Sequence, residues 1–306
     1  LGIINILGVS ITKYLNNLIT AAKLLPLLLF IAAGIFFLTS GKLPPAPPGT
    51  EAREDYIPAI ILVFYAYCGF ESLAVAAGEM ENPRRNVPLS LLITMAVVSF
   101  VYILVQWVSI GVLGADLSEN TAPIAEAAGR LAGSFGKFLV VAGTLVSIGG
   151  INIASSFVTP RCGVALSENG ILPLFISRKC RFGTPYVAIL ISVIFTLPLI
   201  FTGSFVQLAA ISAISRFVQY IPTSLSVLVF RKRNPKESYS FRIPFGPVVP
   251  LVSVLVSIWL LAFTALEVDS KTGARTGIEK MVWGLSGLLI GVPIYFFMKR
   301  LKNKNI

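Results

Sequence analysis

Apolar residues gather along this chain in long runs that are separated by short polar and charged segments. A membrane helix needs about 20 predominantly apolar residues to cross the hydrocarbon core of a bilayer. Eight runs come close to this length, so the pattern predicts an all-α membrane protein with about eight transmembrane helices. The predicted helices lie near residues 15–38, 57–79, 88–113, 135–159, 185–202, 205–230, 248–266 and 281–298.

The composition supports the same class of protein. Hydrophobic residues make up 55% of the 306 residues and charged residues only 13%, with a mean hydropathy of +0.83. A soluble domain of this length could not bury so much apolar surface. The net charge of +11 could indicate a nucleic-acid partner, but the basic residues lie between the apolar runs rather than in one patch. We therefore expect a lipid bilayer as the environment and no nucleic acid as a partner.

The distribution of basic residues predicts the orientation in the membrane. Sixteen Lys and Arg lie before the first run, at 80–87, 160–184 and 231–247, and after 298, whereas the alternate loops hold six. Loops rich in Lys and Arg stay on the cytoplasmic side. The sequence therefore predicts a multi-pass protein of the cell (inner or plasma) membrane with both chain ends cytoplasmic.

The sequence lacks the residue patterns of common catalytic and metal sites. It contains no histidine, and its cysteines, Cys68, Cys162 and Cys180, have neither a metal-binding spacing nor an even number for disulfides. Histidine is the usual base of nucleophilic catalysis and the commonest metal ligand. We therefore expect no enzymatic activity, no cofactor and no metal.

The chain is organised around the second apolar run, which carries Glu71 near its middle, next to Gly69. A carboxylate at this depth costs about 2.5–3.5 kcal/mol on insertion scales, so Glu71 should face a polar cavity or a partner. An interrupted membrane helix frees backbone groups that can line a cavity and bind a ligand. The sequence thus predicts a helix break here. The candidate substrate-binding residues are Tyr65, Tyr67, Cys68, Gly69 and Phe70.

Polar residues also occur at helical spacing in the fourth and sixth runs, where the cavity-lining candidates are Ser147, Asn152, Ser155, Arg216 and Gln219. In the fourth run, small and hydroxylated residues could equally serve close helix packing. Arg216 must be paired or hydrated, so it lines the permeation path or pairs structurally with a carboxylate. The sequence does not choose between these alternatives.

Several motifs resemble the amino acid-polyamine-organocation family of permeases. Residues 69–72 (GFES), 76–79 (AAGE) and 81–88 (ENPRRNVP) are similar to the sixth helix of that family and its following loop. Further similarity lies at residues 17–29 (NLITAAKLLPLLL), 165–173 (ALSENGILP), 183–185 (GTP) and 241–244 (FRIP). The resemblance implies an inverted-repeat, five-plus-five transporter bundle, seen in part. Residues 1–306 would then form a single permease domain without the family's first four helices.

The resemblance also implies a function: secondary transport of an amino acid, coupled to protons or to a counter-substrate. It places the substrate ammonium against carbonyls near Tyr65 and Cys68, with Phe70 or Tyr65 closing over it, although aromatic side chains also serve ordinary packing. It assigns proton coupling to Lys23, which could instead be structural. Glu71 is either a proton-sensitive gate or a fixed hydrogen-bonding group. The alternatives are a polyamine or organic-cation transporter and a non-transporting scaffold or nutrient receptor.

Overall fold

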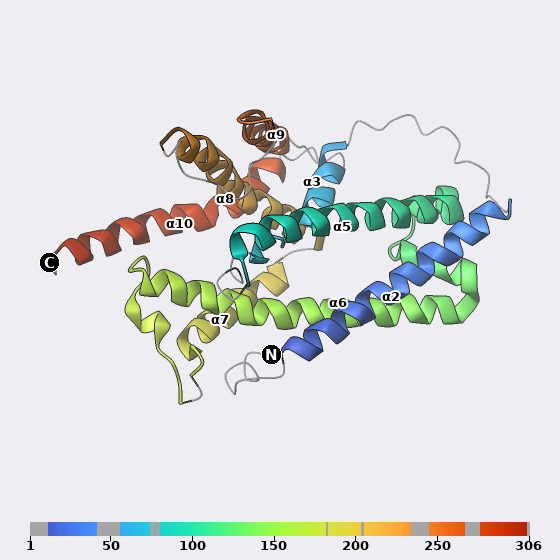
Figure 1. Cartoon of the computed structure of the whole chain (residues 1–306), viewed down its shortest axis with the longest axis horizontal. Coiled ribbons are helices and arrows are strands. Elements are labelled where there is room, and N and C mark those ends of the chain that lie inside the picture. Colours follow the sequence, from blue (N-terminus) through green and yellow to red (C-terminus); the bar gives the residue numbers. More distant parts are fainter. Residues whose placement is uncertain are drawn as a thin grey trace. The chain divides into compact units, whose positions relative to one another are not determined.

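The computed structural model describes residues 12–41, 56–73, 77, 80–181, 183–202, 205–233, 245–266 and 276–304, and these residues form helices joined by turns (Figure 1). No strand occurs among them, so the predicted all-α class is confirmed for the described residues. The helices are α2 (Thr12–Thr39), α3 (Tyr56–Tyr67), α5 (Pro83–Leu113), α6 (Pro123–Glu168), α7 (Tyr186–Thr202), α8 (Phe205–Arg233), α9 (Val248–Ala265) and α10 (Thr276–Lys304), with 3-10 turns at Gly114–Ser118 (η2) and Leu174–Ser177 (η3).

These eight helices correspond in order to the eight predicted membrane helices. Within the described residues, six of them are long and apolar enough to cross a membrane: α2, α5, α6, α8, α9 and α10. The two shorter ones are α3, with 12 residues, and α7, with 17. In the second predicted membrane segment, residues 57–79, the helix α3 ends at Tyr67, near the break that the sequence predicts. Gly78 and Glu79 of the motif at residues 76–79 lie outside the described residues.

Helix α6 consists of two helical segments that meet at a kink. Ala132 and Gly133 have non-helical backbone angles, and Gly133 has a φ of 63°, which glycine adopts without a steric penalty. The predicted membrane helix at 135–159 begins directly after this kink. The segment before it belongs to the region that the sequence assigns to an outer loop, and that loop is therefore partly helical.

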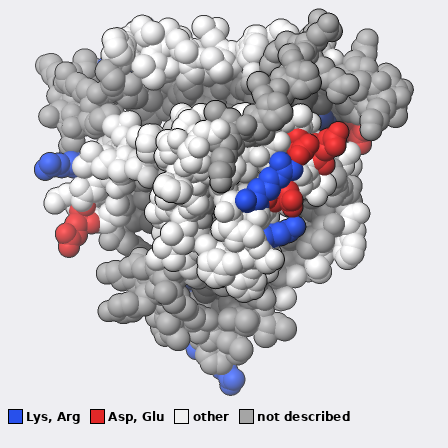
Figure 2. All heavy atoms as spheres, turned by 90° about the vertical axis from the view of Figure 1, so that its right-hand side faces the viewer, with Lys and Arg blue, Asp and Glu red and all other residues white. Residues whose placement is uncertain are grey.

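Charged side chains lie around the turn from α5 to α6. Arg130 forms an ion pair with Asp116 at 2.5 Å, and Lys137 forms one with Glu126 at 3.1 Å. Figure 2 is viewed from the right-hand side of Figure 1 and shows basic and acidic side chains next to each other on the right of this view. Exposed ion pairs contribute only about 0–1 kcal/mol each to stability, so this cluster marks a solvated loop rather than a core.

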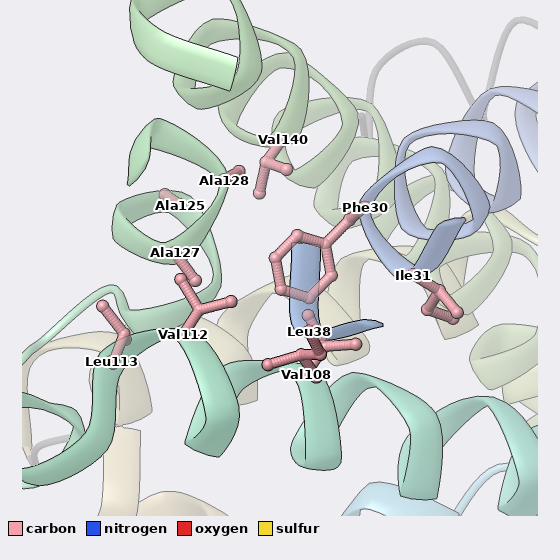
Figure 3. Packing of buried hydrophobic residues seen from close by; sticks show 10 residues of the cluster. All are labelled: Phe30, Ile31, Leu38, Val108, Val112, Leu113, Ala125, Ala127, Ala128 and Val140. Carbon is pink, nitrogen blue, oxygen red and sulfur yellow. The ribbon is translucent and has the colours of Figure 1, made fainter. Parts of the chain in front are cut away.

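The described residues form two compact units. The first contains α2, most of α5 and α6, and the start of α7; its core is built from α2, α5 and α6. Figure 3 shows Phe30 of α2 among side chains of the other two helices. Glycines let the helices approach: a Cβ added at Gly34 would overlap Val108, and one at Gly143 would lie 2.6 Å from Pro26 Cγ. Close approach through small residues is typical of helix packing in membranes.

The second unit contains α3, α8, α9, α10, the start of α5 and the end of α7. Helix α8 is its centre, because α8 packs against α3, α9 and α10. The buried face of α8 carries Ala209, Ala210, Ala213, Ile214 and Phe217, which recur at the spacing of one helical face. Ile61 of α3 packs against the alanines of this face. The small alanine side chains bring α3 close to α8, and this contact positions the polar residues at the end of α3.

Candidate functional site

The break in the second membrane helix lies directly after Tyr67. The amide of Cys68 donates to the carbonyl of Tyr65 at 3.0 Å, and Ser72 donates to Gly69 at 3.1 Å; both bonds span three residues rather than four. Gly69 between them has a φ of +115°, which residues with a Cβ rarely adopt. The predicted interruption of this helix is therefore confirmed, and glycine is the residue that permits it.

Glu71 lies inside the break and has three partners. One carboxylate oxygen, Oε1, forms an ion pair with Nη1 of Arg216 in α8. The other, Oε2, accepts hydrogen bonds from the hydroxyl of Tyr220 and from the backbone amide of Gly69, both at 3.0 Å. Relative exposure of the side chain is 18% for Glu71 and 30% for Arg216. The carboxylate is thus paired, as its depth in an apolar segment requires.

Aromatic rings surround this polar cluster. Phe64 stacks on Phe217 with ring centroids 4.6 Å apart, and the ring of Phe70 lies 5.5 Å from that of Tyr220. Offset or tilted arrangements at these separations are favourable beyond the apolar area that they bury. The rings hold α3 and the break against α8, so Glu71 of the break and Arg216 of α8 meet in a fixed geometry.

Arg216 retains one polar group without a partner. Its Nε atom is buried and donates to no acceptor among the described residues. Buried polar groups almost always have a hydrogen-bond partner, and an unsatisfied one reduces stability by about 1–3 kcal/mol. The guanidinium is therefore held by its ion pair with Glu71 and not by a complete hydrogen-bond network.

Lys23 lies in the first unit, on α2 and next to α6. A Cβ added at Gly150 of α6 would lie 3.2 Å from the Nζ atom of Lys23 and 2.5 Å from Cγ2 of Ile19. The ammonium group therefore lies over a glycine of α6, and the side chain is half-buried. The residues that surround Glu71 belong to the second unit.

The remaining cavity-lining candidates form no interaction with Glu71 among the contacts of the described residues. Asn152 donates from Nδ2 to the carbonyl of Ile148 at 2.9 Å, one turn earlier in α6. Ser155 is exposed, Ser147 is half-buried, and Gln219 is exposed on α8. Of the candidates in the sixth predicted membrane helix, only Arg216 forms an ion pair with the break in the described structure.

Tyr220 is the residue of this cluster that sequence reasoning missed. It follows Arg216 by four positions, so both side chains lie on the same face of α8. This spacing was visible in the sequence. Tyrosine in an apolar helix is commonly a packing residue, however, and nothing in the sequence indicated that its hydroxyl meets Glu71.

Comparisons with known proteins give one family. A model of the amino acid permease family matches residues 1–291 of this chain. The serine/threonine exchanger SteT of Bacillus subtilis is 28% identical, with 98% of this chain and 67% of the relative covered. The branched-chain amino acid permease BcaP of the same organism is 27% identical, with coverages of 97% and 62%.

A further relative, an uncharacterized transporter of Mycobacterium tuberculosis strain H37Rv, is 31% identical over 84% of this chain. The alignment covers 58% of that relative. The chain thus spans about three fifths of the length of the curated relatives that it matches, and the similarity extends over nearly all of its own length.

Proposed function

The chain belongs to the amino acid permease family, a family of multi-pass membrane transporters and not of enzymes, and we propose that it carries amino acids across a membrane by alternating access. The observation that carries this proposal is the interruption of α3 in the middle of an apolar segment, with Glu71 inside it. In membrane transporters, broken helices present backbone groups to a substrate near the centre of the bilayer.

The substrate ammonium would bind backbone carbonyls near Tyr65 and Cys68, because carbonyl dipoles satisfy a cation without adding net charge. Phe70 is 36% exposed and lies beside the break, so it is a candidate to cover the bound substrate. Tyr65, Tyr67, Cys68 and Gly69 would form the remainder of this site.

The proposed architecture is the inverted-repeat, five-plus-five bundle of transporters, in a single permease domain. Helices α3, α5, α6, α7 and α8 would form the second repeat, α2 would be the last helix of the first repeat, and α9 and α10 would be peripheral. Both chain ends would be cytoplasmic, because the loops rich in Lys and Arg lie on that side.

For coupling, we propose a proton carried by Lys23 or exchange against a second amino acid. The ammonium of Lys23 lies against α6, the helix that also carries Ser147, Asn152 and Ser155. A change of charge at this position would bias the equilibrium between inward-open and outward-open states. Exchange agrees with the name of the relative SteT, a serine/threonine exchanger.

The test is uptake into liposomes that contain the purified complete gene product. Radiolabelled serine and leucine are offered at the outside, with and without an internal amino acid and with and without a proton gradient. We expect saturable uptake above protein-free liposomes. Phe70→Ala should raise KM about tenfold by removing one apolar contact of the substrate. The matched control Phe297→Ala, at a position of α10 that is 63% exposed, should leave KM unchanged.

Two results would overturn the proposal, the first its transport function and the second its assignment of the substrate site to the break. One is the absence of uptake and exchange for all twenty amino acids in a preparation that is folded and monodisperse. The other is an equal effect of Phe70→Ala and Phe297→Ala on KM, which would separate transport from the break in α3.

A further inference from the structure

We propose that Arg216 determines the charge class of the substrate: by neutralising Glu71, it restricts the site to amino acids without a net charge and excludes those with a second cationic group. This inference rests on the transport function proposed above. It concerns the ion pair between α8 and the break after α3, and both partners belong to the second unit.

The geometry leaves Glu71 little capacity to bind a substrate. An ionised carboxylate offers about four lone-pair sites for hydrogen bonds. Three donors already occupy Glu71: Arg216 at Oε1, and Tyr220 and the amide of Gly69 at Oε2. A substrate ammonium group that approached this carboxylate would find about one open lone-pair site, on a group whose charge Arg216 already compensates.

The charges near the break also cancel. Helices α3, α8 and α9 contain no acidic residue, and in α10 the acid Glu279 lies near the helix start next to the cation Lys280. Within α8, Arg216 is the only cationic residue before the basic end at Arg231. The pair of Glu71 and Arg216 therefore has no net charge, and the described residues of the break add backbone dipoles and the uncharged side chains of Cys68 and Ser72.

A zwitterionic amino acid fits such a site and a cationic one does not. The ammonium of a zwitterion can bind backbone carbonyls and its carboxylate can bind backbone amides. Broken helices in transporters present such backbone groups to their substrates. A second ammonium group would lose its hydration and would find no unpaired anion to bind. In a low-dielectric environment the free-energy cost of this lost hydration is large. Removal of Arg216 would expose the negative charge of Glu71 and reverse the preference.

A purely structural role for the pair accounts less well for its geometry. An ion pair that is partly removed from water commonly contributes no more stability than apolar side chains of similar volume, because both charges lose part of their hydration. Here the buried Nε atom of Arg216 also lacks an acceptor among the described residues, which reduces stability further. Aromatic contacts such as Phe64 on Phe217 already join α3 to α8. The position of the two charges at the break thus fits a role in selecting the charge of the substrate better than a role in folding.

The experiment measures substrate preference in liposomes that contain the complete gene product. Uptake of the best neutral amino acid is measured as labelled substrate, and L-lysine and L-glutamate are added as competitors. In the wild type, both competitors should inhibit weakly. Arg216→Gln should lower the inhibition constant of L-lysine at least about tenfold, because Glu71 is then unpaired. Glu71→Gln should produce the opposite change and favour L-glutamate, and the double variant should return to the wild-type preference.

Two control variants separate charge from folding. Arg216→Lys keeps the cation and should keep the wild-type preference. Arg130→Gln removes an arginine from the exposed pair with Asp116 and should change neither uptake nor preference. If Arg216→Gln fails to fold, the opposite shift expected of Glu71→Gln and the preference of the double variant still test the proposal.

The outcomes are distinguishable. In one outcome, the single variants take up the neutral amino acid with unchanged inhibition constants for L-lysine and L-glutamate. This result would overturn the role of Arg216 and leave the transport proposal standing. Strong inhibition of wild-type uptake by L-lysine would also overturn the role proposed for Arg216. Absence of any amino acid uptake in the wild type would instead overturn the transport function on which the inference rests.

Discussion

The hydroxyl of Tyr220 donates a hydrogen bond to Oε2 of Glu71 at 3.0 Å, although the two residues are 149 positions apart in the chain. This bond connects α8 to the break after α3. The ring of Tyr220 also lies 5.5 Å from that of Phe70, so one side chain contacts both a polar and an apolar residue of the break. Tyr220 therefore orients the carboxylate while the ion pair with Arg216 compensates its charge.

Replacement of Tyr220 by Phe should separate these two contacts. Tyr220→Phe keeps the ring and removes the donor to Glu71. Since a hydrogen bond to a charged group contributes about 1.5–3 kcal/mol, we expect a loss of stability in this range. The measurement is thermal or denaturant unfolding in detergent. The matched control Tyr295→Phe, on an exposed position of α10, should stay within about 0.5 kcal/mol of the wild type. Equal losses in both variants would argue against a contribution of the Tyr220 hydroxyl.

Gly69→Ala should destabilise the break although space for a methyl group is available. An added Cβ at Gly69 meets no atom within 4 Å, but the φ of +115° is strained for any residue with a Cβ. Such strain costs about 1–3 kcal/mol. Gly291 of α10 also has open space around an added Cβ but lies in regular helix, so Gly291→Ala should be neutral or slightly stabilising. A Gly69→Ala variant as stable as wild type would contradict this backbone geometry.

Gly150→Ala should disturb the packing of α2 on α6. The added Cβ would lie 2.5 Å from Cγ2 of Ile19 and 3.1 Å from Cε of Lys23, so both side chains would have to move. Overpacking of this kind costs about 1–3 kcal/mol. The neighbouring residue provides the control, because a Cβ at Gly149 meets nothing within 4 Å. Unfolding of the two variants in detergent should therefore differ, and equal stabilities would exclude the close approach of the two helices.

Lys23→Met should remove proton coupling and preserve folding. The substitution keeps the length and apolar part of the side chain and removes its ammonium group. We expect normal membrane insertion, uptake that no longer responds to a proton gradient, and exchange that persists. The check is uptake in liposomes at several internal and external pH values. An unchanged pH profile would show that Lys23 is structural, whereas a loss of folded protein would indicate a packing role.

The orientation of the chain should be visible in single-cysteine labelling. In a background without Cys68, Cys162 and Cys180, a cysteine introduced by Arg85→Cys should react with an impermeant reagent from the cytoplasmic side only. Glu119→Cys, in the turn between α5 and α6, should react from the outside. Both positions are exposed in the structure. Labelling of Arg85→Cys from the outside would invert the predicted topology.

The sequence alone determined the class of the protein and the order of its helices. A bilayer accepts only segments whose backbone groups are internally bonded and whose side chains are apolar, so each membrane helix leaves a long apolar run in the sequence. The break after α3 was also readable, since a carboxylate in such a run needs polar surroundings and the adjacent glycine permits the backbone to leave the helix. The helix ends were predicted less closely: α5 begins at Pro83, five residues before its predicted start, because proline is accepted at the first position of a helix.

Only the tertiary structure decided which polar groups meet. Glu71 and Arg216 were each recognised as charges that need a partner, but both alternatives for Arg216 remained open in the sequence. The choice of partner depends on how α3 packs against the alanine face of α8, and packing between distant segments has no local signal. The same packing brings Tyr220 to Glu71, whereas in the other unit the contact of α2 with α6 places the ammonium of Lys23 over Gly150. Apolar length is a property of each segment, whereas an ion pair is a property of two segments and of the contact between them.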